Sequence, residues 1–162
     1  EIQPNRSEAR KGMGYLYFRL GHFGKATEML EKCLALNPSP NPVFELITGK
    51  NAIAPFKLQT TPRTKLGQIY LLNGDSQKAI TYFSEELKQQ SDQPSAYTGL
   101  GLAYLAQNRG LEARAAFTMA IRLAPLNNSA QRGLRQAIQT IVNKRLGRKS
   151  AYSEVSPGTS PN

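Results

Sequence analysis

A set of residues that recurs at a spacing of 34 positions is the strongest constraint on what this chain can fold into. Gly101 follows Gly67 by 34 residues, and the other members that the two stretches share keep the same interval. The earlier stretch reads Leu66, Gly67, Tyr70, Gly74, Ala79, Phe83 and Glu86, and the later reads Leu100, Gly101, Tyr104, Asn108, Ala113, Phe117 and Ala120. A third stretch has the same internal spacings: Met13, Gly14, Tyr17, Gly21, Ala26, Leu30, Cys33 and Pro38. Such a period is typical of a fold built from stacked structural units.

Each unit contains two helical segments joined by a short polar break. In the last unit, apolar residues recur at helical intervals over 96–106 and again over 111–123. Gly or Asn lies in each break, as at Gly21, Gly74 and Asn108, and both residue types tolerate the left-handed conformation that ends a helix. The pattern therefore predicts helix–turn–helix hairpins and an all-α fold.

Small residues face one another within each predicted hairpin. Gly14, Gly67 and Gly101 lie on the first helices and are expected to face the second, where Ala26, Ala79 and Ala113 lie opposite them. Small side chains on both helices let the two axes approach closely.

These residues together resemble the tetratricopeptide repeat, whose unit has a large residue, Leu-Gly, Tyr, Ala, Phe, Ala and Pro at fixed places. The three matching units cover residues 7–40, 60–93 and 94–127. Tryptophan is absent from the first large position, and Cys33 and Glu86 replace a small Ala. Glu86 stands at a place that is normally packed, so the second helix of its unit is the least firmly predicted. The resemblance implies a superhelical stack of hairpins.

The two ends of the chain continue the pattern. Ile2 and Pro4 have the phase of Leu123 and Pro125, so residues 1–6 are expected to be the end of a preceding repeat and the chain the C-terminal part of a longer array. Asn127-Asn128-Ser129 is a natural helix start, and residues 128–147 predict a capping helix with one apolar face. Residues 148–162 are rich in Ser, Pro and Gly and are expected to be disordered.

An insertion separates the first two units. Gly67 follows Gly14 by 53 residues, which is 19 more than the repeat length, and the extra residues fall in 41–59. Pro42 and Pro55 prevent one unbroken helix. The segment is either an extended excursion or short hairpin folded back on the stack, which we favour, or an eroded hairpin of repeat ancestry.

The resemblance also implies where a partner binds. In tetratricopeptide arrays the first helices line a concave groove in which extended peptides or helices lie. Carried over place by place, the groove residues are Lys11, Tyr15, Phe18, Arg19, Thr64, Gln68, Leu71, Leu72, Thr98, Leu102 and Leu105, with Arg132 and Gln136 from the capping helix. Leu71, Leu72, Leu102 and Leu105 have an equally good alternative role in packing between hairpins.

The side chains at these places favour one kind of partner. The family's chaperone cofactors clamp a C-terminal carboxylate with Lys and Asn residues, and only Lys11 matches that set, since Tyr15 and Gln68 stand where Asn is needed. An extended apolar or amphipathic segment with acidic character fits better, because apolar residues supply contact area while Arg19 and Arg132 orient charge.

The charge balance supports an alternative function. The net charge is +10 and the pI about 9.9, which would suit nucleic acid or another anionic polymer bound through the basic surface. The basic residues are spread along the chain, however, as on ordinary solvated helix faces. No apolar stretch approaches the roughly 20 residues of a membrane span. A soluble protein, cytoplasmic or periplasmic, is therefore expected.

Residues for catalysis, metals or cofactors are scarce. His22, the single histidine, lies in a predicted turn, and the single cysteine, Cys33, matches a buried packing position. No arrangement of a nucleophile with a base is readable. We therefore expect a protein–protein interaction scaffold, not an enzyme, with no cofactor and with its oligomeric state open.

Overall fold

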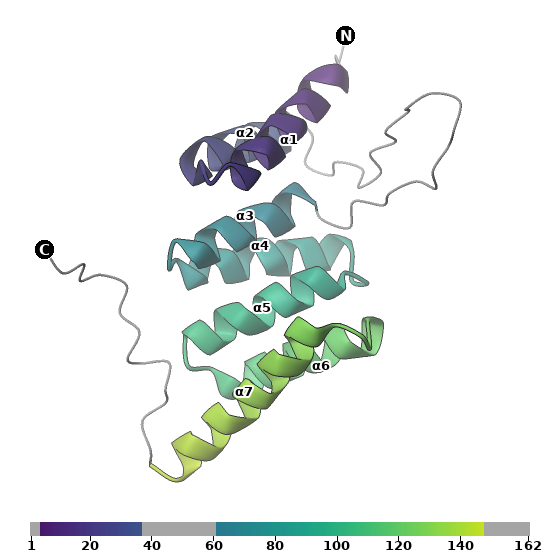
Figure 1. Cartoon of the computed structure of the whole chain (residues 1–162). Coiled ribbons are helices and arrows are strands. Elements are labelled where there is room, and N and C mark those ends of the chain that lie inside the picture. Colours follow the sequence, from purple (N-terminus) through teal and green to yellow (C-terminus); the bar gives the residue numbers. More distant parts are fainter. Residues whose placement is uncertain (1–3, 37–60, 148–162) are drawn as a thin grey trace, which may run out of the picture. The chain divides into compact units, whose positions relative to one another are not determined.

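The computed structural model describes residues 4–36 and 61–147, with side chains from residue 7 onward, and these residues form helices joined by short turns (Figure 1). The helices are α1 (Pro4–Arg19), α2 (Phe23–Leu36), α3 (Pro62–Leu72), α4 (Ser76–Gln89), α5 (Pro94–Ala106), α6 (Gly110–Leu123) and α7 (Asn128–Arg145). The described part of the chain contains no strand. The all-α prediction is confirmed.

Local sequence explains where several helices begin. Pro62 and Pro94 are at the start of α3 and α5, where a missing N–H costs nothing and the fixed φ favours a helix. Thr61 and Asp75 cap α3 and α4, accepting hydrogen bonds from the backbone N–H groups three residues later at 3.2 and 3.0 Å. Each cap satisfies a donor that the first helical turn leaves unpaired.

The turns between paired helices have the predicted conformation. Gly21, Gly74 and Asn108 have φ values of +76°, +82° and +58°, in the left-handed region. Glycine enters this region without a steric penalty, and asparagine is one of the few other residues that tolerate it. The polar breaks therefore close helical hairpins, as the sequence indicates.

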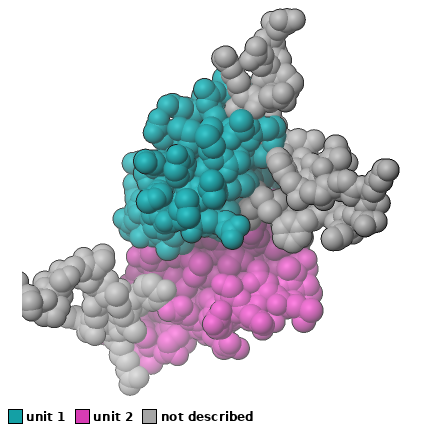
Figure 2. Space-filling view, turned by 45° about the horizontal axis from the view of Figure 1, so that its top comes forward, with its two compact units in different colours: residues 1–91 teal, residues 92–162 magenta. Residues whose placement is uncertain are grey.

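The chain divides into two compact units, coloured separately in Figure 2. Unit 1 extends to Ser91 and contains the hairpins α1–α2 and α3–α4, with α3 also packed on α2. Unit 2 begins at Asp92 and contains the hairpin α5–α6, with α7 packed mainly on α6 and also on α5. Within each unit, successive hairpins or helices therefore stack through a second helix and the first helix that follows it.

The glycines that recur at the same place of each unit correspond to close helix contacts inside each hairpin. A Cβ atom added to Gly67 would lie 2.7 Å from the ring of Phe83, and one added to Gly101 would lie 2.7 Å from the ring of Phe117. The same addition at Gly14 would meet Leu30 at 2.7 Å. The glycines face the second helix as predicted. The space beside each glycine is filled by a large side chain of that helix, four positions after its alanine: Leu30, Phe83 or Phe117.

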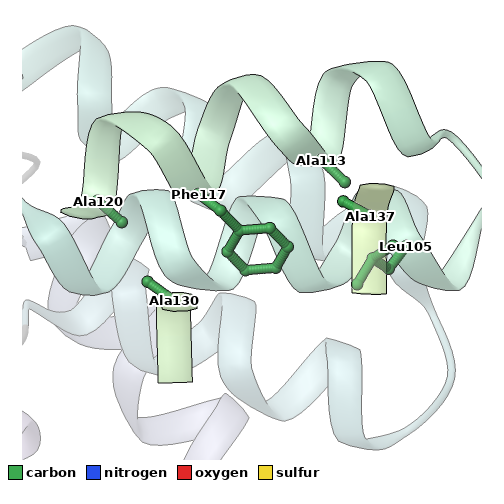
Figure 3. Packing of buried hydrophobic residues seen from close by; sticks show 6 residues of the cluster. All are labelled: Leu105, Ala113, Phe117, Ala120, Ala130 and Ala137. Carbon is green, nitrogen blue, oxygen red and sulfur yellow. The ribbon is translucent and has the colours of Figure 1, made fainter. Parts of the chain in front are cut away.

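Phe117 is the centre of the core of unit 2, and Figure 3 shows its ring pointing away from α6 toward its neighbours. The cluster consists of Leu105 from α5, Ala113, Phe117 and Ala120 from α6, and Ala130 and Ala137 from α7. Small alanines around one aromatic ring allow three helices to meet at native packing density. This core requires α7, so the capping helix is an integral part of the unit.

Three expectations can be compared directly with the helix bounds. In the segment expected to form a capping helix, Asn127 caps α7 and Leu146 ends it. The helix α4 is continuous despite Glu86, whose side chain is only 2 % exposed. The first unit was expected to start at Ser7, whereas α1 begins at Pro4, because proline is favourable in the first turn of a helix. The insertion at 41–59 and the tail at 148–162 lie outside the described residues.

Candidate partner-binding surface

In unit 1, the first helices α1 and α3 lie in contact and bring their predicted groove residues together. The ammonium group of Lys65 on α3 lies 4.4 Å from the centroid of the Phe18 ring on α1, a cation–π contact. Phe18 also packs against Phe23, with ring centroids 5.8 Å apart. Aromatic and basic groups therefore share one surface at this pair of helices.

This surface, called the α1–α3 surface below, combines half-buried and exposed side chains. It consists of Tyr15, Phe18 and Arg19 from α1 and Lys65, Gln68, Leu71 and Leu72 from α3. Arg19 is exposed, and Leu72 is 64 % exposed, which is high for a large apolar residue. The remaining members are half-buried, so their positions are fixed by packing while part of each side chain stays accessible.

Two further predicted residues in unit 1 are buried and add no open area. The side chain of Lys11 is 6 % exposed, and its ammonium lies 2.6 Å from the Glu8 carboxylate. Thr64 is fully buried, and its hydroxyl accepts a hydrogen bond from the hydroxyl of Thr61 at 3.2 Å. Lys11 is therefore already neutralised by a carboxylate of its own helix.

Burial also shifts the titration of two members of the surface. It raises the pKa of Tyr15 above its ordinary value, with the nearby thiol of Cys33 and carboxylate of Glu86 acting in the same direction. Burial lowers the pKa of the Lys65 ammonium. The Tyr15 hydroxyl consequently stays protonated to higher pH than an exposed tyrosine.

In unit 2, the predicted groove residues divide between core and surface. Leu105 is 1 % exposed and belongs to the core cluster around Phe117, and Leu102 packs against that cluster while remaining half-buried. Thr98 is 8 % exposed. Of the capping-helix residues, Arg132 and Gln136 are both exposed.

The hydroxyl of Thr98 has a structural role. It donates to the carbonyl of Pro94 at 2.8 Å and accepts from the side-chain amide of Asn127 at 3.0 Å. Thr98 therefore fixes the start of α7 against α5 instead of presenting an open polar group.

Lys65 is the member of the surface that the sequence reasoning missed. It occupies the sixth place of its unit, which the family pattern does not assign to the groove. The signal was available, because the sixth place is Gly12, Gly99 and Gly133 in the other units and the capping helix. A long basic side chain at a place that is glycine in the other units indicates that the surface of α3 differs there from the surfaces of the other first helices.

The described residues contain no cluster of three or more His, Cys, Asp or Glu side chains that could hold a metal ion. None of the helices in that part of the chain is both long and apolar enough to span a bilayer. A shallow hollow in unit 2, between the α5–α6 turn and α7, is lined by Arg109, Glu112 and Lys144 among others, and Arg109 already pairs with Glu112 at 3.0 Å.

Comparison with known proteins identifies the repeats. Tetratricopeptide repeat family profiles match residues 12–40 and 64–128. The photosystem I assembly protein Ycf3 of Prochlorococcus marinus strain MIT 9211 is 30 % identical over 138 residues, covering 72 % of this chain and 70 % of that protein. Its counterpart in strain MIT 9303 is 28 % identical over 146 residues, covering 77 % and 74 %.

Solved structures agree on the fold. The first tetratricopeptide domain of human RPAP3 superimposes with a TM-score of 0.72 at 20 % identity, covering 88 % of this chain and 98 % of that one. The Sgt2 tetratricopeptide domain from Aspergillus fumigatus gives a TM-score of 0.71 at 18 % identity, covering 97 % and 92 %. The first tetratricopeptide domain of Spaghetti (RPAP3), bound to the HSP90 peptide SRMEEVD, gives a TM-score of 0.70 at 20 % identity, covering 85 % of this chain and 94 % of that one. The repeat spacing, the helical hairpins and these matches together show that the chain belongs to the tetratricopeptide-repeat family.

Proposed function

We propose that this chain is a protein–protein interaction scaffold that binds an extended peptide or helix of a partner on the faces of its first helices, within a larger assembly. The observation that carries the proposal is the α1–α3 surface, where Phe18, Lys65 and Leu72 place aromatic, basic and exposed apolar groups on adjacent helices. Two kinds of relative support it: Ycf3 proteins are named for assembly of photosystem I, and an RPAP3 domain of the same fold binds a peptide.

The chemistry of the surface defines the partner. Phe18, Leu71 and Leu72 offer apolar area, which favours a segment with large apolar side chains on one face. Arg19 adds an exposed positive charge, and the net charge of +10 steers acidic segments toward the protein. The side-chain oxygen of Gln68 accepts a hydrogen bond from the Lys65 ammonium at 3.1 Å, and its amide N–H groups can donate to a peptide carbonyl. The partner is therefore an amphipathic or extended apolar segment with acidic residues.

A carboxylate clamp of the kind implied by some family members is not proposed. Such a clamp needs a lysine whose ammonium is available, and Lys11 is instead buried against Glu8. We expect the peptide SRMEEVD to bind the full chain with a dissociation constant no tighter than about 100 μM, equivalent to roughly −5.5 kcal/mol. Calorimetric titration checks this, and low-micromolar binding lost in Lys11→Ala would contradict it.

The main test begins with a defined probe. The full chain selects peptides from a phage-displayed library of random 12-residue sequences, and the dissociation constant of the selected peptide is then measured by calorimetry. The test variant is Arg19→Ala/Leu72→Ala, because both side chains are exposed and their removal should not disturb folding. The matched control is Glu28→Ala/Lys32→Ala, which removes an exposed ion pair from α2.

The proposal expects selected peptides to be amphipathic and acidic, and to bind the test variant at least about tenfold more weakly, a loss near 1.4 kcal/mol. The control should bind as the natural chain does. Equal binding by the test variant and the natural chain would overturn the assignment of this surface.

A further inference from the structure

The outer face of α1, on the side away from α2, carries an apolar stripe that no described residue covers. It consists of Ala9, Gly12, Met13, Leu16 and Leu20, called the α1 stripe below. Met13, Leu16 and Leu20 are 43 %, 56 % and 60 % exposed, and a Cβ added to Gly12 would meet nothing within 4 Å. Contiguous exposed apolar residues on one helix face indicate an interaction site.

The capping helix α7 carries the same stripe in the same register, and there it is occupied. Counting from Ser7 and from Asn128, the third, sixth, seventh, tenth and fourteenth places are Ala130, Gly133, Leu134, Ala137 and Ile141 in α7. Ala130 and Ala137 are fully buried against α6, and Leu134 packs on the same core. All five places are therefore apolar in both helices, but only those of α7 are covered.

The sixth place shows most directly what covers the stripe in unit 2. A Cβ added to Gly133 would overlap the ring of Phe117, so this glycine provides the space in which the aromatic side chain of α6 lies. At the fourteenth place, Ile141 packs beside Gly110 at the start of α6, 2.9 Å from where a Cβ of Gly110 would be. The occupant of this stripe is the second helix of the preceding hairpin.

Unit 1 shows the same packing of a first helix on the second helix before it, where α3 packs on α2. Leu66 and Ile69 hold the seventh and tenth places of α3, and both form one buried cluster with Ala26 and Leu30 of α2. Two separate instances thus show that these places receive a second helix with a large residue four positions after an alanine. In α1 the corresponding places are open.

We propose that the α1 stripe is a docking site for the second helix of a further tetratricopeptide hairpin stacked ahead of α1, with a Phe or Leu of that helix packed over Gly12. A second copy of this chain cannot supply such a residue while folded, because Leu30, Phe83 and Phe117 are all fully buried. The site is distinct from the α1–α3 surface, which uses other places of α1, so either proposal can fail without the other.

The test adds a hairpin to the full chain in the repeat register. A copy of residues 94–121 is joined directly ahead of Glu1, which places the copied Phe117 sixteen residues before Gly12, as Phe117 is before Gly133. Thermal unfolding is measured for the natural chain, for the fusion, and for both with Gly12→Leu. The control substitution is Gly24→Leu, since Gly24 is also exposed with nothing within 4 Å of an added Cβ.

The fusion is expected to unfold roughly 5 °C or more above the natural chain, because docking buries the stripe. Gly12→Leu should remove that gain from the fusion without lowering the melting temperature of the natural chain, and Gly24→Leu should leave the gain intact. No gain in the fusion, or a gain that survives Gly12→Leu, would overturn the proposal. Sedimentation of the natural chain as a dimer that Leu16→Lys dissociates would instead assign the stripe to a second copy, also overturning it.

Discussion

Gly101 and Gly133 both lie against the Phe117 ring, so they are expected to tolerate no added side chain. Gly133→Ala should destabilise the protein by about 1–3 kcal/mol, because the new methyl group would overlap the ring and force the packed helices apart. The matched control is Gly12→Ala, also inside a helix but facing open space, which should stabilise by about 0.5–1 kcal/mol. Urea unfolding followed by circular dichroism measures both, and equal effects of the two substitutions would contradict this account.

Glu86 is the second residue whose environment leads to a prediction. Its burial raises the pKa of the carboxyl group, an effect that the nearby Thr61 side chain and the charge of Arg63 offset in part. A carboxyl whose pKa is higher in the folded state favours folding at low pH, and that contribution is lost as pH rises through the folded-state pKa. The charged form is therefore a cost at neutral pH.

Glu86→Gln is accordingly expected to raise the melting temperature at pH 7 by more than at pH 4, because the amide has no charge to bury. Melting curves at several pH values between 4 and 8 measure the difference between variant and natural chain. The adjacent Glu85 is half-exposed, so Glu85→Gln serves as the control and should show little such dependence. The melting temperature of Glu86→Gln minus that of the natural chain is the quantity compared. If this difference were lower at pH 7 than at pH 4, Glu86 would be stabilised as an anion.

Individual residues also show how far the sequence could be interpreted. The left-handed turn residues and the burial of Cys33 follow from the repeat pattern, because backbone conformation and packing set them locally. The burial of Lys11 and Thr64 could not be obtained in this way, since burial depends on how neighbouring helices pack. Family position alone assigned both to the groove.

At the scale of elements, Asn127 links the capping helix to the rest of unit 2. Its side-chain oxygen accepts from the backbone N–H of Ala130 at 3.0 Å, and its amide donates to Thr98 at 3.0 Å. Asn127→Ala should destabilise unit 2 by about 1–2 kcal/mol, because both interactions are lost. Asn127→Asp keeps the cap acceptor and should lose less.

Urea unfolding measures the loss of stability in each variant. Hydrogen exchange of the α7 amides shows how far the start of α7 opens when the cap is lost. The neighbouring Asn128 is exposed, so Asn128→Ala is the control and should change stability by no more than about 0.5 kcal/mol. If Asn127→Ala were as mild as its control, the cap would not hold α7 in place.

The elements themselves were the most predictable part of the fold. Periodic apolar positions indicate α5 and α6, and Asn127 marks the start of α7, because these local signals agree with the packing. The beginning of α1 at Pro4 was not obtained, since residues 1–6 were expected to be the end of a preceding repeat. Local preference for proline in the first helical turn decided the boundary.

For the molecule as a whole, the proposed scaffold should bind by apolar contact more than by charge. If so, the affinity for the selected acidic peptide should fall less than tenfold between 50 and 200 mM salt, because one or two ion pairs are screened. A nucleic acid or other polymer held by six or more basic contacts would lose about 10³-fold or more over that range. Fluorescence anisotropy with the labelled peptide distinguishes the two outcomes.

The whole-molecule function was inferred from the family resemblance, and the details of the surface needed the structure. The sequence could name the first-helix places but not decide which side chains remain open. Leu105 is in the core and Leu72 is exposed, although both are leucines at groove places, because their neighbours differ. Accessibility depends on the packing of several helices at once.

The central claim is that the first helices, and not the second, form the binding face. Chemical-shift mapping of the isotope-labelled full chain with the library-selected peptide tests it most directly. The account predicts that the largest shifts fall on α1 and α3, at Phe18, Arg19 and Leu72, and that Arg19→Ala/Leu72→Ala abolishes them. Largest shifts on the second helices α2, α4 or α6, unaffected by that double substitution, would contradict it.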